Sequence, residues 1–373
     1  MKMKAAVHYE IGKPVKVEDV TLDEPQANEV LVKVAATGIC HSDIHFMHGH
    51  MPQPLPVVLG HEGAGVVERV GPGVTTLKPG DHVIMVVILS CGRCLHCIEG
   101  QPSVCQEWLN YHLMGSLPGG TKRLHKNGQE LNHFFNQSSF AEYAVVTERT
   151  AIKVRDDAPL DVVCTLGCGT STGIGAVINT AGFKAGQTIA VFGCGGVGLS
   201  AIMAAKLCGA DKIFAVDTND MKLQKAKELG AEYLINASQE DPVQRITALS
   251  GRGTSYTGGG VDHAIECTGS VTVMAQAFDS VRVAGNCVLA GMAPLGSKVS
   301  VDAWGFNVGK KIIGSVQGDV RAQIDIPAYV DLYMAGKLPI DKLISKRYKG
   351  LDNINEVIAD LENGRVVRGV VVF

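Results

Sequence analysis

The sequence predicts an α/β protein that combines a doubly wound parallel sheet with a separate β-rich part. Two observations carry this prediction. Residues 1–146 read mainly as short β-rich runs separated by turns, and residues beyond about 170 alternate compact apolar runs with Ala- and Leu-rich helical segments. Alternating strands and helices are typical of a parallel sheet with helices on both faces. At 373 residues, the chain has the length of about two domains.

The β-rich part is expected to contain strands at 30–36, 63–70 and 82–89, because these Val-rich runs lie between Pro-Gly turns. The polar stretch 106–137 has little periodicity, and we expect a long surface loop there. In the second part, short apolar runs are expected to be strands and longer ones helices. The expected strands are 188–192, 212–216, 234–236, 261–266, 286–290 and 369–373, and the expected helices are 197–208, 221–229, 326–335 and 354–363.

The composition argues against several classes of function. The formal net charge is −3, so we expect no basic surface for nucleic acids or anionic membranes. Residues 1–10 do not resemble a signal peptide, and no apolar run has the length of a membrane helix. Eleven cysteines without a secretion signal indicate a reducing environment. We therefore expect a cytoplasmic protein with neither a nucleic acid nor a membrane as partner.

Four cysteines form the most informative local pattern. Cys91, Cys94, Cys97 and Cys105 have the spacing C-x2-C-x2-C-x7-C, which allows one short loop to surround a zinc ion with four thiolates. Buried small residues or a pair of disulfides are the alternatives. Because four ligands leave no open coordination position, we expect a structural zinc here and the chemistry elsewhere.

A glycine-rich motif follows the apolar run 188–192. Gly193, Gly195 and Gly198 form GxGxxG between an expected strand and an expected helix, the context in which this motif binds the pyrophosphate of a dinucleotide. Asp217 ends the next strand, where a carboxylate accepts hydrogen bonds from the adenosine ribose and repels a 2′-phosphate. The motif therefore favours NAD over NADP. The alternative is a glycine-rich turn in another α/β fold, with Asp217 as a helix cap.

Three scattered residues could form a second metal site. Cys40 and His61 lie in the β-rich part, and Cys168 lies near its junction with the α/β part. Together they would supply three ligands and leave one position open, as a catalytic zinc requires. Spacing alone does not select them, because neighbouring histidines offer competing sets. These histidines are His41, His45, His48 and His50.

Four local motifs resemble those of zinc-dependent alcohol dehydrogenases of the medium-chain dehydrogenase/reductase superfamily, in the long-chain branch of liver-type and class III-like enzymes. They are the segments 38–43 (GICHSD), 60–65 (GHEGAG) and 166–173 (LGCGTSTG) and the cysteine loop at about 91–105, in the family's order. The resemblance implies a GroES-like, partly β-barrel catalytic domain at 1–170 and 317–373, which carries the structural zinc lobe. A Rossmann NAD-binding domain would be inserted at 171–316.

The resemblance also implies the catalytic chemistry. It makes Cys40, His61 and Cys168 the ligands of the catalytic zinc, so that the protein would hold two zinc ions per chain. Zinc lowers the pKa of a bound hydroxyl, and the alcohol would then deliver hydride to NAD. Ser42 and His45 would relay the released proton. As an alternative, Ser42 is a turn hydroxyl and His45 is one histidine among several.

Further roles follow from the same resemblance. Asp43 would orient the histidine ligand, and Glu62 would tune the zinc. Lys222 would lie near the adenosine ribose and Arg368 would pair with the pyrophosphate, although both could be solvated surface cations. The residues implied for cofactor binding are Gly193, Gly195, Gly196, Val197, Gly198, Asp217, Lys222, Thr172 and Arg368.

The expected substrate pocket is apolar. Glutathione-dependent members of this branch bind their adduct partly through an Asp and an Arg, and Met51 and Leu109 stand at those positions. Because neither side chain can pair with a charge, we expect a primary alcohol or aldehyde with an alkyl, terpenoid or aromatic body. The pocket residues implied by the resemblance are Val87, Phe134, Phe135 and Met292.

The expected function is zinc-dependent hydride transfer between such an alcohol and NAD, in a homodimer or homotetramer. One alternative is a formaldehyde dehydrogenase acting on an S-hydroxymethyl adduct of another thiol. A zinc-free quinone reductase of the same superfamily is disfavoured by the three scattered ligands. A zinc-knuckle protein that binds nucleic acid is disfavoured by the negative charge and the dinucleotide motif. The Gly-rich stretch 251–260 suggests no function.

Overall fold

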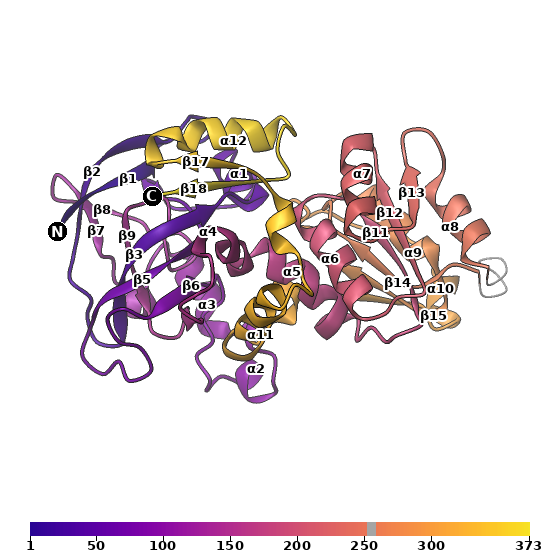
Figure 1. The fold of residues 1–373 in the computed structure, drawn as a ribbon, viewed down its shortest axis with the longest axis horizontal. Coiled ribbons are helices and arrows are strands. Elements are labelled where there is room, and N and C mark those ends of the chain that lie inside the picture. Colours follow the sequence, from indigo (N-terminus) through magenta and orange to yellow (C-terminus); the bar gives the residue numbers. More distant parts are fainter. Residues whose placement is uncertain (252–258) are drawn as a thin grey trace. The chain divides into compact units, whose positions relative to one another are not determined.

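The computed structural model in Figure 1 describes residues 1–251 and 259–373, and Leu109 by its backbone alone. Most of the Gly-rich stretch 251–260 and the side chain at position 109 therefore lie outside the described residues. The described residues form two compact units. Unit 1 comprises Met1–Cys168 and Arg321–Phe373, and unit 2 comprises Gly169–Val320.

Unit 1 contains two β-sheets that are mainly antiparallel. The first has five strands in the order β4-β1-β2-β7-β8, and the inward-facing residues of β1 and β2 pack into an apolar core with Leu117 and Leu131. The strands are β1 (Lys2–His8), β2 (Lys16–Leu22), β4 (Val57–Val58), β7 (Leu124–Lys126) and β8 (Gln129–Leu131).

The second sheet of unit 1 joins the two ends of the chain. Its strands run in the order β10-β6-β5-β3-β18-β17, with β9 also paired to β3. The C-terminal strand β18 lies antiparallel to β3, with Val370 opposite Gly38, which confirms that both ends of the chain build this partly barrel-like part. The strands are β3 (Glu29–Gly38), β5 (Glu62–Val70), β6 (His82–Met85), β9 (Tyr143–Thr147), β10 (Ala151–Lys153), β17 (Ile344–Lys349) and β18 (Arg368–Val372).

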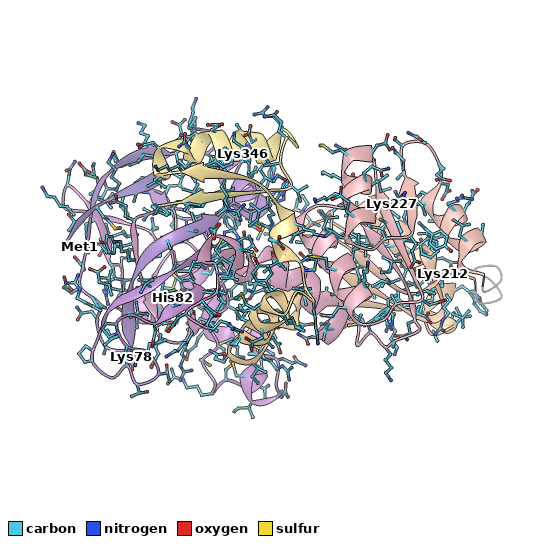
Figure 2. The ribbon with its side chains drawn as sticks, viewed as in Figure 1. Met1, Lys78, His82, Lys212, Lys227 and Lys346 are labelled. Atoms are coloured by element: carbon cyan, nitrogen blue, oxygen red, sulfur yellow. The ribbon has the colours of Figure 1, made fainter. Side chains whose placement is uncertain are left out.

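Six α-helices accompany these sheets in the described part of unit 1. Lys346 ties β17 to α12, because its ammonium lies 2.7 Å from Glu356 and 4.2 Å from the centre of the Tyr348 ring (Figure 2). The helices are α1 (His41–Met47), α2 (Leu95–Ile98), α3 (Gln106–Leu113), α4 (Leu160–Val163), α11 (Ala322–Met334) and α12 (Ile354–Glu362).

The expectation of one long loop over 106–137 is wrong. Helix α3 occupies Gln106–Leu113, and the antiparallel pair of β7 and β8 follows. Only half of the eight residues of α3 are apolar or aromatic, so its apolar periodicity is weak, and a tertiary contact stabilises it. The indole Nε1 of Trp108 donates a hydrogen bond to the carbonyl oxygen of Val87 at 2.7 Å. Such contacts routinely override local propensity.

Unit 2 is built on one parallel sheet of six strands in the order β13-β12-β11-β14-β15-β16. Its strands are β11 (Thr188–Phe192), β12 (Lys212–Asp217), β13 (Tyr233–Asn236), β14 (Val261–Glu266), β15 (Val281–Leu289) and β16 (Lys311–Gly314). Its helices are α5 (Gly169–Gly175), α6 (Gly196–Leu207), α7 (Asp220–Leu229), α8 (Pro242–Ser250), α9 (Val271–Ser280) and α10 (Trp304–Asn307).

The strand order of unit 2 confirms the predicted doubly wound fold. The chain moves from β11 outward to β13, then returns to β14 beside β11 and moves outward on the other side. Because such crossovers are right-handed, the helices of the two halves cover opposite faces. In agreement, α6 contacts α7, and α8 contacts α9. The order reverses between β11 and β14, the place where doubly wound sheets bind their ligands.

Among the described residues, no single helix has the length and apolar character needed to cross a membrane. One bent pair of short helices, Leu160–Gly167 with Gly169–Thr180, meets the length and composition criteria taken together.

Close packing of α6 on β11 predicts a strong effect of one added methyl group. A Cβ at Gly198 would overlap the carbonyl oxygen of Gly193, whereas a Cβ at Gly195 would have no neighbour within 4 Å. We predict that Gly198→Ala lowers the free energy of unfolding by about 1–3 kcal/mol, as overpacking does, and that Gly195→Ala leaves it nearly unchanged. Chemical denaturation checks both. Equal stability of the two variants would contradict this account of the turn.

Candidate active site and metal centres

The four cysteines of the loop converge on one point in unit 1. Their sulfur atoms lie within 4.8 Å of one another, and the Cys91–Cys97 and Cys94–Cys105 sulfurs are each 4.0 Å apart. Four thiolates bound tetrahedrally at about 2.3 Å from zinc would be separated by about 3.8 Å. All four are free thiols, so the disulfide alternative is wrong, and the set fits a structural zinc.

Backbone N–H groups of this loop point to the cysteine sulfurs and so favour their thiolate forms, which bind a cation. The backbone N–H of Cys91 points to the sulfur of Cys105 at 3.3 Å, and that of Cys94 points to the sulfur of Cys91 at 3.3 Å. Backbone N–H groups of Cys97 and Gln106 lower the pKa of Cys94 to about 6. Burial raises the pKa of Cys97 to about 12. A bound cation is therefore needed to keep all four sulfurs ionised.

The second set of metal donors is assembled from three distant segments of unit 1. Cys40 precedes α1, His61 precedes β5, and Cys168 follows the turn Cys164–Gly167. The donor atoms of Cys40, His61, Glu62 and Cys168 lie within 4.8 Å of one another. His61 is fully buried, and its Nε2 makes no hydrogen bond within the described residues. A buried, unpaired imidazole nitrogen beside two thiols fits a zinc ion.

Asp43 fixes two of these donors in place. It is fully buried, and one carboxylate oxygen accepts from the backbone N–H of Cys40 at 3.0 Å. The other oxygen lies 3.0 Å from Nδ1 of His61 and 3.2 Å from the backbone nitrogen of Gly60. Burial lowers the pKa of His61, but Asp43 and the Cys40 thiolate raise it above its ordinary value. The carboxylate thus aims Nε2 toward the metal position.

Glu62 and Arg368 form a buried ion pair beside the metal donors. Nη1 of Arg368 donates to both carboxylate oxygens of Glu62 at 2.8 and 2.9 Å, and to the carbonyl oxygen of Ile39 at 3.3 Å. Glu62 is 0% exposed and Arg368 is 3% exposed, so the alternative of a solvated Arg368 is wrong. Burial lowers the pKa of Arg368, but Glu62 raises it above its ordinary value. The pairing of β18 with β3 brings this arginine to the site.

The two residues expected to relay the proton both lie on α1. The hydroxyl of Ser42 lies 3.7 Å from the sulfur of Cys40. His45 lies one helical turn further, and its Nδ1 is 3.1 Å from Nδ1 of His50. Burial and the neighbouring His50 lower the pKa of His45. The relay role itself remains a prediction.

Aromatic side chains surround the histidine ligand, and two of them, Trp108 and His112, are not indicated by any sequence motif. The ring of Phe135 lies 4.9 Å from that of His61, and the fully buried Phe134 lies 5.4 Å from it. His112 stacks on Phe135 at 4.0 Å, and Trp108 stacks on His112 at 5.8 Å. Trp108 and His112 are four residues apart on α3, a helix that the sequence pattern does not reveal. The buried Val87 contributes its carbonyl oxygen to Trp108.

The glycine motif in unit 2 forms the turn from β11 to α6. Gly195 precedes α6, which begins with Gly196 and Val197, so the helix N-terminus follows the turn directly. Asp217 ends β12, and its carboxylate accepts from the backbone N–H groups of Cys194 at 2.7 Å and Asn219 at 3.0 Å. The helix cap of α7 is Asn219, not Asp217, so the alternative role of Asp217 as that cap is wrong.

The remaining expected cofactor and pocket residues lie at several places in unit 2. Thr172 is buried in α5, and Lys222 is half-buried in the first turn of α7. Met292 follows β15 and is 38% exposed. Their roles in binding remain predictions.

The buried ion pair predicts a large change in stability. We predict that Arg368→Met lowers the free energy of unfolding by about 3–5 kcal/mol, because it leaves the Glu62 carboxylate buried without its cation. Arg347→Met is the matched control, because Arg347 forms an exposed ion pair with Asp161 and should cost at most about 1 kcal/mol. Denaturant titration of both variants checks the difference. A loss for Arg368→Met as small as the control's would mean that the pair is not stabilising.

Two protein families match the chain. The family "Alcohol dehydrogenase GroES-like domain" matches residues 26–156, and the family "Zinc-binding dehydrogenase" matches residues 196–335. Together they cover more than half of the 373 residues. An S-(hydroxymethyl)glutathione dehydrogenase of Paracoccus denitrificans is 41% identical over the full length of both chains.

Solved structures share the same architecture. Benzyl alcohol dehydrogenase from Acinetobacter calcoaceticus is 38% identical with a TM-score of 0.93, and covers 100% of this chain and 99% of its own. A zinc-binding dehydrogenase from Sinorhizobium meliloti bound to NADP is 28% identical over 100% of both chains, with a TM-score of 0.82. An alcohol dehydrogenase from E. coli CFT073 complexed with NADH is 25% identical with a TM-score of 0.81, and covers 100% of this chain and 99% of its own.

The family matches, the fold and the two groups of metal donors all point to the same protein family. Similarity at this level over full length shows a common family, and both groups of metal donors expected of that family are present in the described structure. The chain belongs to the zinc-dependent alcohol dehydrogenases of the medium-chain dehydrogenase/reductase superfamily, and it resembles the class III members of that family.

Proposed function

We propose that this alcohol dehydrogenase oxidises the hydroxymethyl group of a formaldehyde–thiol adduct, with NAD as hydride acceptor. The full-length similarity to S-(hydroxymethyl)glutathione dehydrogenases carries this proposal. It supports the thiol-adduct alternative better than the expected alkyl, terpenoid or aromatic alcohol. Met51 and the residue at position 109 cannot pair with the charges of glutathione, so we infer an adduct whose thiol part presents an uncharged body there.

The residues of unit 1 would prepare the hydroxyl group for reaction. Cys40, His61 and Cys168 would hold the catalytic zinc, which supplies a Lewis acid that lowers the pKa of a nearby hydroxyl. Asp43 keeps Nδ1 of His61 engaged, so that Nε2 is the free donor. The aromatic rings of Phe134 and Phe135 beside His61 would exclude water from the reacting carbon.

The proton of the substrate needs a route out of this buried site. We assign Ser42 Oγ as its first acceptor, because this hydroxyl lies 3.7 Å from the Cys40 sulfur. His45 would be the next base, one helical turn further along α1. Its lowered pKa keeps the imidazole neutral near pH 7 and therefore able to accept a proton.

Unit 2 would bind the dinucleotide. The N-terminus of α6, at Gly196 and Val197, would bind the pyrophosphate, and Asp217 would bind the adenosine ribose. Lys222 would approach the ribose, and Thr172 would contact the cofactor. The expected role of Arg368 at the pyrophosphate stays a prediction. The expected role of Met292 in substrate binding also stays a prediction.

A specific observation favours a second candidate, an aromatic primary alcohol. Trp108, His112 and Phe135 form a continuous stack, and Phe135 lies 4.9 Å from the ring of His61. Such a stack suits a flat ring. The resemblance in architecture to benzyl alcohol dehydrogenase supports the same candidate.

Two further features belong to the proposal. The eleven cysteines of the chain are free, which suits a reducing compartment such as the cytoplasm. A homodimer or homotetramer is the expected assembly of the working enzyme.

A substrate panel tests the proposed function. Wild-type protein is assayed by NADH absorbance with benzyl alcohol, with octanol, and with formaldehyde plus glutathione or 2-mercaptoethanol. We predict that a thiol adduct has the highest kcat/KM, by about tenfold or more, which corresponds to about 1.4 kcal/mol of transition-state binding. Faster turnover of benzyl alcohol would favour the second candidate. Cys40→Ser is the control, because it should lose turnover of every substrate while still binding NADH.

The cofactor assignment predicts a change of preference. Asp217→Gly removes the carboxylate that would repel a 2′-phosphate, so the ratio of kcat/KM for NADP to that for NAD should rise about tenfold or more. Glu228→Gln is the matched control, since Glu228 is an exposed acid on the following helix, α7, where it pairs with Lys225. If both variants keep the wild-type ratio, Asp217 does not discriminate between the cofactors.

The two groups of metal donors predict a metal content. Inductively coupled plasma mass spectrometry should find about two zinc ions per wild-type chain, one for each group. His61→Ala and Cys94→Ser should each reduce this to about one, because each removes a ligand from a different site. A wild-type content near one would refute one of the two sites.

A further inference from the structure

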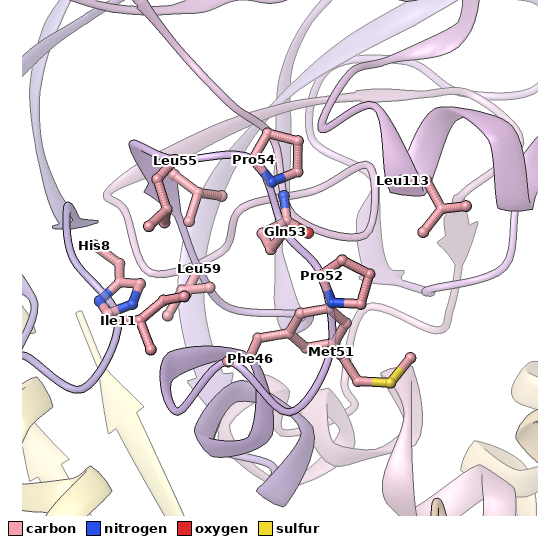
Figure 3. A pocket seen from close by; sticks show the side chains of 12 residues that line it. His8, Ile11, Phe46, Met51, Pro52, Gln53, Pro54, Leu55, Leu59 and Leu113 are labelled. Atoms are coloured by element: carbon pink, nitrogen blue, oxygen red, sulfur yellow. The ribbon is translucent and has the colours of Figure 1, made fainter. Parts of the chain in front are cut away.

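A cavity in unit 1 lies outside the two metal centres. Its volume is about 340 Å³, which is within the range of small-molecule sites. None of the residues that line it is among the metal donors or the expected proton relay. Figure 3 shows His8 and Ile11 toward one side of the cavity and Leu113 toward the other. The lining residues are His8, Ile11, Phe46, Gly49, Met51, Pro52, Gln53, Pro54, Leu55, Val57, Leu59 and Leu113.

Two polar side chains in this apolar wall have buried atoms without hydrogen-bond partners within the described residues. His8 is 1% exposed. The backbone of Lys13 lies near enough to oppose the lowering of the His8 pKa by burial, but neither ring nitrogen has a described partner in good hydrogen-bond geometry. Gln53 donates through Nε2 to the carbonyl oxygen of His133 at 3.3 Å, but its buried Oε1 accepts nothing. A buried polar atom without a partner costs about 1–3 kcal/mol. Most native proteins therefore pair such atoms, with a ligand or with water if not with protein.

The charge state of His8 limits the chemistry of a ligand. Burial lowers the pKa of His8, and the nearby His48 lowers it further, while the Lys13 backbone opposes this only in part. A neutral imidazole offers one donor and one acceptor, and Gln53 Oε1 offers one acceptor. A neutral hydroxyl group, which both donates and accepts, complements this set. A carboxylate or an ammonium group would instead be buried against apolar walls without a counter-charge.

We propose that this cavity is a binding site for a small neutral molecule that carries one hydroxyl group on a compact apolar body, such as a phenol or a short alcohol. The hydroxyl pairs with His8, and the body contacts Phe46, Leu55 and Leu59. The cavity contains none of the metal donors, but it includes Met51, which the proposed function places beside the thiol part of the adduct. Binding in the cavity and oxidation of the adduct are tested by different measurements, so either proposal can fail without the other.

Phenol is a suitable probe, because its hydroxyl carbon has no hydrogen that could be transferred as hydride. Zinc-loaded protein with labelled Ile, Leu, Val and Met methyl groups is titrated with phenol and followed by NMR. Methyl groups of Ile11, Leu55 and Leu113 report on the cavity, and those of Val87 report on the surroundings of the catalytic metal donors. The expected result is saturable shifts of the cavity methyl groups, with or without separate shifts at Val87.

A cycle of two ligands and two proteins isolates the hydroxyl contact. Benzene is the matched ligand without a hydroxyl group, and His8→Leu is the variant without an imidazole. We expect phenol to bind His8→Leu about fivefold to tenfold more weakly than wild type, while benzene binds both alike. His125→Leu is the control variant, because His125 lies on β7 outside the cavity and pairs with Asp23.

Two results would overturn the proposal. Shifts confined to Val87 would mean that phenol binds only near the metal donors. Equal affinity for phenol and benzene in wild type, unchanged in His8→Leu, would mean that His8 pairs with water alone. If His8→Leu does not fold, the wild-type comparison of phenol with benzene and the nitrogen chemical shifts of the His8 ring decide the same question.

Discussion

The buried carboxylate of Asp43 holds the catalytic metal site together. It accepts hydrogen bonds from the backbone of Cys40 and of Gly60 and from the ring of His61. These groups come from two segments that have no local reason to meet. Because a charge of this kind is stable in a buried site only when it is fully hydrogen-bonded, each contact supports the others. The carboxylate also selects which nitrogen of His61 remains free for a metal.

A second buried charged group, Arg368, connects the metal donors to the C-terminal strand. Strand β18 pairs with β3, and this register brings Arg368 against Glu62, directly beside His61 in sequence. The C-terminus therefore completes both a sheet and the electrostatic surroundings of the metal donors. Arg368 and Glu62 are both buried, so removal of either one leaves the charge of the other unpaired. This explains why a metal site near the N-terminus depends on the last residues of the fold.

The two metal centres differ in how their donors are brought together. The cysteine loop draws its four donors from one short segment and its own backbone N–H groups, so it closes the coordination shell of one ion locally. The other centre uses side chains from three segments and is walled by aromatic rings from α3 and from Phe134 and Phe135. The local site suits a structural role because four thiolates close the coordination shell, and the assembled site suits chemistry because Cys40, His61 and Cys168 would leave one position open.

Features whose partners are close along the chain could be predicted from the amino-acid sequence alone. The cysteine spacing, the turn from β11 to α6 and the alternating strands of unit 2 are local patterns, and periodicity reveals them. Resemblance to a family was needed for Cys40, His61 and Cys168, because no spacing rule joins them. Three features became visible only in the folded molecule: residues 106–113 form a helix, Arg368 is buried against Glu62, and His8 lines a cavity. Each of these depends on contacts between distant segments, whose free energies exceed the weak local preferences that a sequence displays.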